Sequence, residues 1–190
     1  PTGGAIPKPD LTGRLLVVGT RLRSVFSFPN PVNEVAARVV AGGVVVLSAA
    51  AVSFREPWLL IPLCYGFWAR VATGPSLSPL GQLATRVVAP RLGPPRLVAG
   101  PPKRFAQAMG VVFSSAALIL WFGFGLQGAT WGVVGVLIAA ALAESALGLC
   151  VGCRVFAGLM RMGIIPDEVC AACADISLRH PGIRPEAAPT

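Results

Sequence analysis

The sequence predicts an all-α integral membrane protein with four transmembrane helices. Of its 190 residues, 54% are hydrophobic and only 13% are charged, and the mean hydropathy is +0.71. A soluble domain carries roughly 25% charged residues. Apolar runs long enough to cross a bilayer alternate with short polar connections, and the basic residues gather on one side of these runs. We find no pattern of a cleavable secretion signal, so we expect the first span to act as the insertion signal.

Residues 1–30 form a Pro- and Gly-rich segment before the first span. Its charged residues are mostly basic: Lys8, Arg14, Arg21 and Arg23 against Asp10. We expect a basic tail on the anionic cytoplasmic leaflet. Nucleic acid is not an expected partner, because the chain is strongly apolar and does not interleave aromatic with basic residues.

The first two spans are expected at about 35–54 and 57–73, joined by a tight turn. Asn30 followed by proline favours a helix start with Asn30 as the N-cap. Twenty residues at a rise of 1.5 Å cross the roughly 30 Å hydrocarbon core. Arg38 lies near enough to the end of the first span to snorkel to the interface.

The connection from 74 to 104 is polar and rich in proline. Within it, residues 79–88 predict an amphipathic helix lying in the membrane interface, because the apolar residues recur at helical spacing. These residues are Leu80, Leu83, Ala84, Val87 and Val88. The third and fourth spans are expected at about 105–126 and 131–153, joined by a short uncharged turn.

The distribution of charge predicts the orientation. If both tight turns face outward, fifteen of the sixteen Lys and Arg residues lie on the opposite side, and only Arg55 faces outward. The positive-inside rule then places both termini in the cytoplasm. We expect the protein to lie in the plasma membrane. Residues 31–162 would form the membrane domain and residues 163–190 a cytoplasmic C-terminal segment.

An internal repeat indicates that the four spans are two helical hairpins related by duplication. Arg38 aligns with Arg104, and residues 45–51 align with 111–117 at the same offset. On this alignment the paired cysteines belong to the second hairpin only.

Four of the five cysteines form two C-x2-C pairs: Cys150 and Cys153, then Cys170 and Cys173. This spacing is typical of a four-thiolate metal site. Two such pairs can close a tetrahedral site around zinc, and a closed site of this kind is structural. Zinc is therefore the cofactor that this interpretation predicts, with all four cysteines as ligands.

A redox role is the alternative for the same cysteines, with each pair acting as a dithiol. A reactive C-x2-C usually lies at a helix N-terminus, where the dipole lowers the thiol pKa. We expect Cys150 and Cys153 at the C-terminus of the fourth span, and Cys170 and Cys173 early in a following short helix. The second pair would then supply the better nucleophiles. A third interpretation is that the thiols are inert packing residues.

The segments around both cysteine pairs, Leu147–Phe156 and Gly163–Cys173, resemble a known family of bacterial membrane proteins, the domain of unknown function 4395. The resemblance runs from about residue 30 to residue 176 and does not explain the basic tail. It implies a compact four-helix membrane protein of the actinobacterial type. Members are often encoded among thioredoxin-like and sulfurtransferase proteins, and the family supplies no established activity.

Glu144 is the second residue that invites a functional interpretation, because it lies within the expected fourth span. A carboxylate inside the bilayer is costly and must find a proton or a partner. It could relay protons beside the thiols, or be held by a hydrogen bond to Ser114, Ser115 or Gln107. Ser145 is expected to join helices through its hydroxyl group.

The remaining candidates carry less weight. Cys64 is expected to be a small buried residue, and His180, the only histidine, a surface residue in the C-terminal segment. A lone histidine cannot complete a Ser-His-Asp set, and the sequence favours a protein that is not an autonomous enzyme.

Two functions follow from these expectations. In the first, the protein is an accessory or structural subunit of a larger membrane assembly, such as a respiratory one, stapled by the four-cysteine site. In the second, it is a membrane component of thiol or sulfur redox chemistry that passes electrons to a thioredoxin-like or sulfurtransferase partner.

Overall fold

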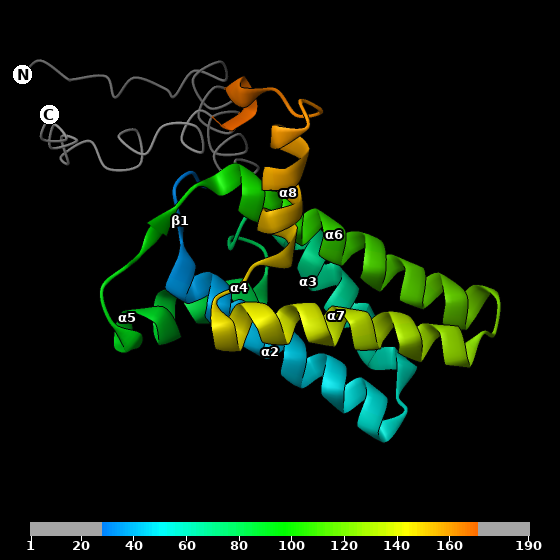
Figure 1. The fold of residues 1–190 in the computed structure, drawn as a ribbon. Coiled ribbons are helices and arrows are strands. Elements are labelled where there is room, and N and C mark those ends of the chain that lie inside the picture. Colours follow the sequence, from blue (N-terminus) through cyan, green and yellow to red (C-terminus); the bar gives the residue numbers. More distant parts are fainter. Residues whose placement is uncertain (1–27, 171–190) are drawn as a thin grey trace, which may run out of the picture.

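A computed structural model describes residues 28–170 of the chain (Figure 1). Four helices lie side by side as a bundle: α2 (Glu34–Phe54), α3 (Leu60–Thr73), α6 (Gly100–Leu118) and α7 (Gln127–Leu147). An eleven-residue helix, α8 (Val151–Arg161), stands against one end of this bundle. The basic tail up to residue 27, and Cys173 and His180, lie outside the described residues.

Within residues 28–170, three helical segments are long and apolar enough to cross a membrane, which indicates a membrane protein. They are Glu34–Phe54, Gly100–Gly123 and Gln127–Leu147. The second of these continues α6 through a π-helical turn, Ile119–Gly123. Helix α3 has 14 residues and is preceded by a 3-10 turn, Pro57–Leu59, so it is shorter than the roughly 20 residues that a typical span requires.

The bundle is held together mainly by α2 against α7 and α3 against α6, with α6 also lying along α7. The two helices of the first expected hairpin, α2 and α3, make comparatively few contacts with each other. A close approach of α3 to α6 is made possible by Gly110, since a Cβ built there would lie 2.2 Å from the ring of Phe67. Phe67, Leu63, Val134 and Leu137 are buried in this core.

The start of α2 differs from the prediction. Asn33, not Asn30, is the N-cap, and its side-chain oxygen accepts a hydrogen bond from the Val35 N–H at 3.0 Å. The reason is a short antiparallel pairing of β1 (Val32–Asn33) with β2 (Leu97–Val98), which delays the helix. Asn30 instead accepts a hydrogen bond from the Gly100 N–H, at the start of α6.

The connection from α3 to α6 contains a helical segment, as expected. It consists of α4 (Pro79–Leu83), a π-helical turn (Ala84–Val88) and α5 (Ala89–Leu92). Ser78 is its N-cap and accepts a hydrogen bond from the Gly81 N–H. Leu80 packs on α2 where Gly43 leaves room for it, whereas Leu83 and Val87 stay exposed on the outer side.

The predicted ends of the last two spans are shifted. Helix α6 begins at Gly100, and α7 begins at Gln127 and ends at Leu147 rather than continuing to Cys153. Gly148 adopts a left-handed conformation, φ 69°, and ends the helix. Twenty-one residues already suffice to cross a bilayer, so the chain can turn before the cysteines. The two tight turns lie at the end of the bundle opposite α8 (Figure 1).

Candidate dithiol site

Cys150 is the N-cap of α8. Its backbone is extended, and its sulfur accepts a hydrogen bond from the backbone N–H of Cys153 at 3.4 Å. Both cysteines therefore lie at a helix N-terminus, where unpaired N–H groups and the helix dipole favour a thiolate. The expectation that they lie at the C-terminal end of a span is wrong, because α7 and α8 are separate helices.

The turn between α7 and α8 follows from a few local features. The N–H groups of Gly148 and Leu149 donate to the carbonyls of Glu144 and Ala143, which closes α7 at the left-handed Gly148. Arg38 of α2 donates to the carbonyls of Ser145 and Ala146, so its charge lies at the negative end of the α7 dipole. The chain then leaves α7 in a fixed direction and reaches Cys150.

Gly152 sets the position of α8. A Cβ built on Gly152 would lie 2.5 Å from the Cα of Ala106, so only glycine permits this contact between the two backbones. Phe156, one turn further on, packs on Phe105 with ring centroids 5.6 Å apart. Helix α8 is thereby fixed against α6 over its first two turns, and the two cysteines are held beside the N-terminal part of α6.

The two thiols have different acidities. The pKa of Cys150 is lowered, first because the Cys153 thiol donates a hydrogen bond to its sulfur and also because Lys103 attracts its charge. The pKa of Cys153 is raised, first by that same hydrogen bond and then by burial. Burial and Glu144 oppose the ionisation of Cys150. We assign the thiolate to Cys150 and the shared proton to Cys153.

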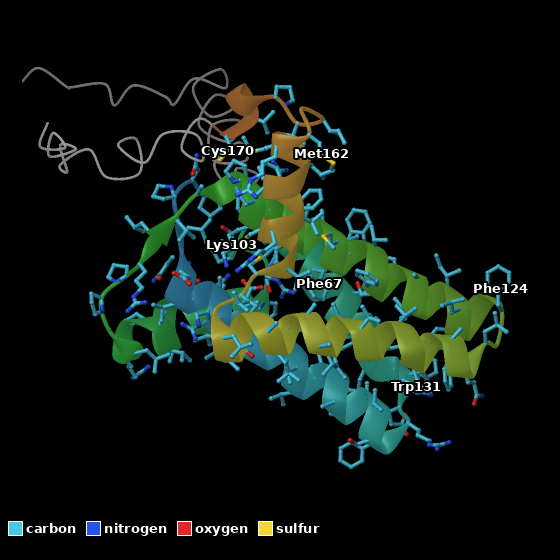
Figure 2. All side chains as sticks on the ribbon, in the orientation of Figure 1. Phe67, Lys103, Phe124, Trp131, Met162 and Cys170 are labelled. Carbon is cyan, nitrogen blue, oxygen red and sulfur yellow. The ribbon has the colours of Figure 1, made fainter. Side chains whose placement is uncertain are left out.

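Lys103 and Glu144 form an ion pair beside the dithiol, with Lys103 Nζ 2.7 Å from Glu144 Oε1. The pair joins α6 to α7, and both side chains are largely buried. Figure 2 shows Lys103 near the base of α8, where that helix meets the bundle. Lys103 takes the place of the three hydrogen-bond partners predicted for Glu144. Ser114 bonds within α6, Ser115 lies against Cys64, and Gln107 accepts a hydrogen bond from Arg70.

Sequence reasoning missed Lys103 and Arg70, both of which are buried. Arg70 lies on α3, where Nε donates to Gln107 Oε1 at 2.8 Å and Nη1 donates to Ser78 Oγ at 3.2 Å. Its position inside the expected second span was the available signal, since an ionisable residue at membrane depth needs a partner. Nothing in the sequence indicates that Lys103 is buried, because it lies next to Arg104 in a segment predicted to be a basic loop.

A cavity of about 140 Å³ reaches from the dithiol into the bundle. Its polar lining comes from Cys150, Glu144 and Gln107, and its other walls are mostly apolar residues of α2, α6 and α7, with Phe67 of α3 and the start of α8. Cys150 is 8% exposed, whereas Cys153 is partly exposed. The thiolate therefore opens on this cavity, and its partner thiol lies nearer to the surface.

The second cysteine pair is only partly described. Cys170 ends a 3-10 turn (Asp167–Cys170), packs with Phe156 and Ala99 in a separate hydrophobic cluster, and is disulfide-bonded. It lies near the other end of α8 from Lys103 (Figure 2). Within residues 28–170 no three His, Cys, Asp or Glu side chains form a group that could hold a metal ion. The four-thiolate zinc site stays a prediction, since Cys173 lies outside the described residues.

The minor candidates occupy structural positions. Cys64 is buried with its sulfur 3.4 Å from Ser115 Oγ, which links α3 to α6. The Ser145 hydroxyl donates to Leu142 O within α7, so the interhelical bond at this position uses the Ser145 carbonyl group instead.

Apolar helices of membrane-spanning length, with a C-x2-C motif at one end of the bundle, define a helical membrane protein with a dithiol site. The chain belongs to the family described as Domain of unknown function (DUF4395), whose model matches residues 32–161. The match includes the four bundle helices, α8, Cys150 and Cys153, and it ends before Cys170. No curated protein and no solved structure matches the chain.

Proposed function

We propose that this protein is a membrane dithiol–disulfide exchange protein, with Cys150 as the nucleophile and Cys153 as the resolving cysteine. The observation that carries the proposal is the position of Cys150 as N-cap of α8, with its sulfur accepting the Cys153 N–H. A thiolate is the reactive form of cysteine, and helix N-termini favour it. The lowered pKa of Cys150 supports the same assignment.

The exchange needs only a disulfide of a partner protein. The Cys150 thiolate attacks one partner sulfur, the partner S–S bond breaks, and the other partner sulfur leaves as a thiolate that takes a proton. The Cys153 thiol then loses its proton and attacks the Cys150 sulfur of the mixed disulfide. The Cys150–partner bond breaks, the partner becomes a dithiol, and this chain holds the Cys150–Cys153 disulfide. The reverse sequence oxidises a partner dithiol.

Lys103 and Glu144 act on this step through electrostatics. Lys103 favours the Cys150 thiolate and Glu144 opposes it, so the ion pair moderates the acidity of the thiol. The bond between their side chains keeps both charges in place while the charge on Cys150 changes. Among the described residues, Glu144 bonds to Lys103 and to no further group that could carry a proton away. In this proposal Glu144 is therefore a positioning residue.

The proposed setting is the plasma membrane, with four spans and both termini in the cytoplasm. Helix α3 with its preceding turn, residues 57–73, supplies the remaining span, the second along the chain. At 1.5 Å per residue these 17 residues cover about 25 Å, at the short end of the workable range. Arg55 lies in the tight turn at one end, whereas Arg38, Arg70, Lys103 and Arg104 lie toward the other. This asymmetry supports a cytoplasmic dithiol and hence a thioredoxin-like or sulfurtransferase partner.

A cytoplasmic location would also determine the redox state of the Cys150–Cys153 dithiol at rest. Glutathione and thioredoxin keep most cytosolic thiols reduced, so the Cys150–Cys153 dithiol would wait in its reduced form with Cys150 ionised, in contrast to Cys170, which is disulfide-bonded. The alternative function, an accessory subunit of a larger assembly stapled by zinc, stays a prediction. It would require Cys150 and Cys153 to be metal ligands rather than a reactive pair.

Trapping the partner tests the proposal. In Cys153→Ser the mixed disulfide on Cys150 cannot be resolved, so a covalent complex that dithiothreitol releases should accumulate in membranes from cells expressing the full chain. The same variant with Cys150→Ser in addition is the matched control and should trap nothing. Two outcomes would contradict exchange at Cys150. One is that the single variant Cys153→Ser traps no covalent complex, and the other is that the single and the double variant trap equal amounts.

A further inference from the structure

The cavity at Cys150 extends along α7 toward the middle of that helix. Its lining residues on α7 run from Glu144 back to Val136, about 12 Å of helix at 1.5 Å per residue. Val136 is 54% exposed, so the cavity borders the outer surface of the bundle at this position. Because Val136 lies near the centre of a helix long and apolar enough to cross a membrane, this border faces hydrocarbon. A ligand that enters here comes from the bilayer.

The charges buried at this end of the bundle balance one another. Among the described residues they are two cations, Arg70 and Lys103, and two anions, Glu144 and the Cys150 thiolate. Lys103 and Glu144 are already paired at 2.7 Å. No buried charge is left over to attract an ion, so the cavity suits a neutral ligand.

Gln107 offers the cavity a neutral hydrogen-bond donor. Its Oε1 accepts a hydrogen bond from Arg70 Nε at 2.8 Å, which fixes the orientation of the amide. The amide nitrogen of Gln107 has no hydrogen-bond partner among the described residues and is not fully buried. Since Gln107 lines the cavity, a ligand with a carbonyl oxygen can satisfy this donor.

The size and polarity of the cavity fit a single six-membered ring. Its volume of about 140 Å³ is close to the roughly 150 Å³ of an apolar cavity that holds benzene. The polar lining lies toward the dithiol, at Gln107, Glu144 and Cys150, and the lining toward Val136 is apolar. A fatty acyl chain would fill the apolar part and leave the Gln107 donor unpaired. A ring that carries oxygen and an apolar tail matches both ends.

We propose that this cavity binds the ring of a lipid-soluble quinone, which takes two electrons from the Cys150–Cys153 dithiol. The inference rests on the proposed exchange function, in the direction that oxidises a partner dithiol. Quinones take up the electrons of protein dithiols in the oxidising bacterial periplasm, so this chemistry is open to a dithiol beside a bilayer. Cys150 lines the cavity, and Cys153 lies nearer to the surface.

The electron transfer balances without a further reactant. The Cys150 thiolate adds to a ring carbon of the quinone, an S–C bond forms, and one ring oxygen takes a proton from solution. The Cys153 thiol then loses its proton and attacks the Cys150 sulfur. The S–C bond breaks, its electron pair stays with the ring, and the second ring oxygen takes a proton. The dithiol is oxidised to the Cys150–Cys153 disulfide, and the quinone is reduced to a hydroquinone.

The test uses the reduced full chain in non-ionic detergent, without oxygen, and decylubiquinone as the probe. The ring carbons of this quinone are all substituted, so a stable thioether does not form. Absorbance measures the hydroquinone, and peptide mapping measures the disulfide. We expect one hydroquinone for each Cys150–Cys153 disulfide, at a rate that saturates with quinone concentration. A parallel sample receives diamide, a water-soluble oxidant that does not need the cavity.

Four variants locate the reaction. Ala140→Leu fills the cavity and should slow quinone reduction by about tenfold or more. Val136→Trp should do the same from an exposed position, so a folding defect of the first variant does not decide the outcome. Gln107→Leu should raise the KM for decylubiquinone by about threefold to tenfold and change kcat little. Ala139→Leu, an exposed residue of α7 outside the cavity lining, should react as the unchanged chain does.

The proposal is overturned if diamide forms the Cys150–Cys153 disulfide but decylubiquinone is not reduced; the exchange function then stands. It is also overturned if Ala140→Leu and Val136→Trp both reduce decylubiquinone as fast as the unchanged chain, because the reaction then takes place outside the cavity. If diamide also fails to join the two cysteines, the exchange function is contradicted together with this inference.

Discussion

Lys103 Nζ of α6 lies 2.7 Å from Glu144 Oε1 of α7, beside the N-cap cysteine of α8. The contact links α6 to α7 at the end of the bundle that carries the dithiol. It places a cation and a carboxylate where both affect the charge on Cys150. The acidity of that thiol is therefore a property of the tertiary structure as well as of its helix N-terminus.

Changing either partner should shift the pKa of Cys150 in opposite directions. Lys103→Met removes an attraction to the thiolate and should raise that pKa, whereas Glu144→Gln removes a repulsion and should lower it. The pH dependence of Cys150 alkylation by iodoacetamide measures the shift. Arg104→Met, which removes the neighbouring exposed cation of α6, should leave the profile in place. Shifts of the same sign for both variants would contradict this account.

The same substitutions should lower stability. Removing one partner of a largely buried ion pair leaves the other charge uncompensated, which costs about 3–5 kcal/mol. The double variant Lys103→Met, Glu144→Gln removes both charges and should recover much of the loss. Unfolding by denaturant in detergent gives the comparison, and a double variant as unstable as the sum of the two single ones would show that the pair is not coupled.

The dithiol should react as one thiolate and one protected thiol. Because the pKa of Cys150 is lowered, its reactive form persists as the pH falls below the ordinary thiol range of about 8.5 and is lost only below the lowered value. Because the pKa of Cys153 is raised, that thiol should resist alkylation until the pH is strongly alkaline. Mass-spectrometric mapping of the reduced chain near neutral pH should find the label on Cys150, and preferential label on Cys153 would reverse the assignment.

Gly152→Ala should displace α8 from α6. The added Cβ would meet the backbone of Ala106 at 2.5 Å, and neither backbone can give way without moving a helix. We expect a loss of about 1–3 kcal/mol from overpacking, together with a slower reaction of Cys150. Gly158→Ala is the matched control, because a Cβ at Gly158 meets nothing within 4 Å and alanine favours a helix. Equal stability of the two variants would contradict the close packing of α8.

Arg38→Met should loosen the end of α7. The lost hydrogen bonds to the carbonyls of Ser145 and Ala146, and the lost charge at the helix C-terminus, should together cost about 1–2 kcal/mol. Amide hydrogen exchange of the last turn of α7 should rise relative to the first turns. Unchanged exchange at Gly148 and Leu149 would show that the glycine alone holds the turn.

The sequence predicted the helical content because composition and periodicity carry that information directly. The first span, at 35–54, agrees closely with α2, since a continuous apolar run ends at a polar turn there. The start of α2 was misplaced at Asn30, because the two-residue pairing of Val32–Asn33 with Leu97–Val98 joins segments far apart in the chain. A local capping rule cannot detect such a pairing.

The Cys150–Cys153 pair was found from the sequence, but its position at the start of a separate helix was not predicted. Hydropathy continues through Leu149 and Cys150, so a window over the fourth span runs past Gly148 and hides the break. The partner of Glu144 was missed for a related reason, because the sequence around Lys103 predicts a basic loop. In the structure α6 already begins at Gly100, so Lys103 lies on a helix and its side chain faces the bundle. Burial of that kind depends on tertiary packing.

The most direct test of the account is a redox titration of the purified full chain in detergent against dithiothreitol, with peptide mapping of each cysteine. The account predicts a reversible Cys150–Cys153 disulfide that forms and breaks as a two-electron couple, while the Cys64 thiol is unchanged. If Cys150 and Cys153 never join across the accessible potentials, or if they are protected together by a bound zinc ion, exchange at this site is contradicted.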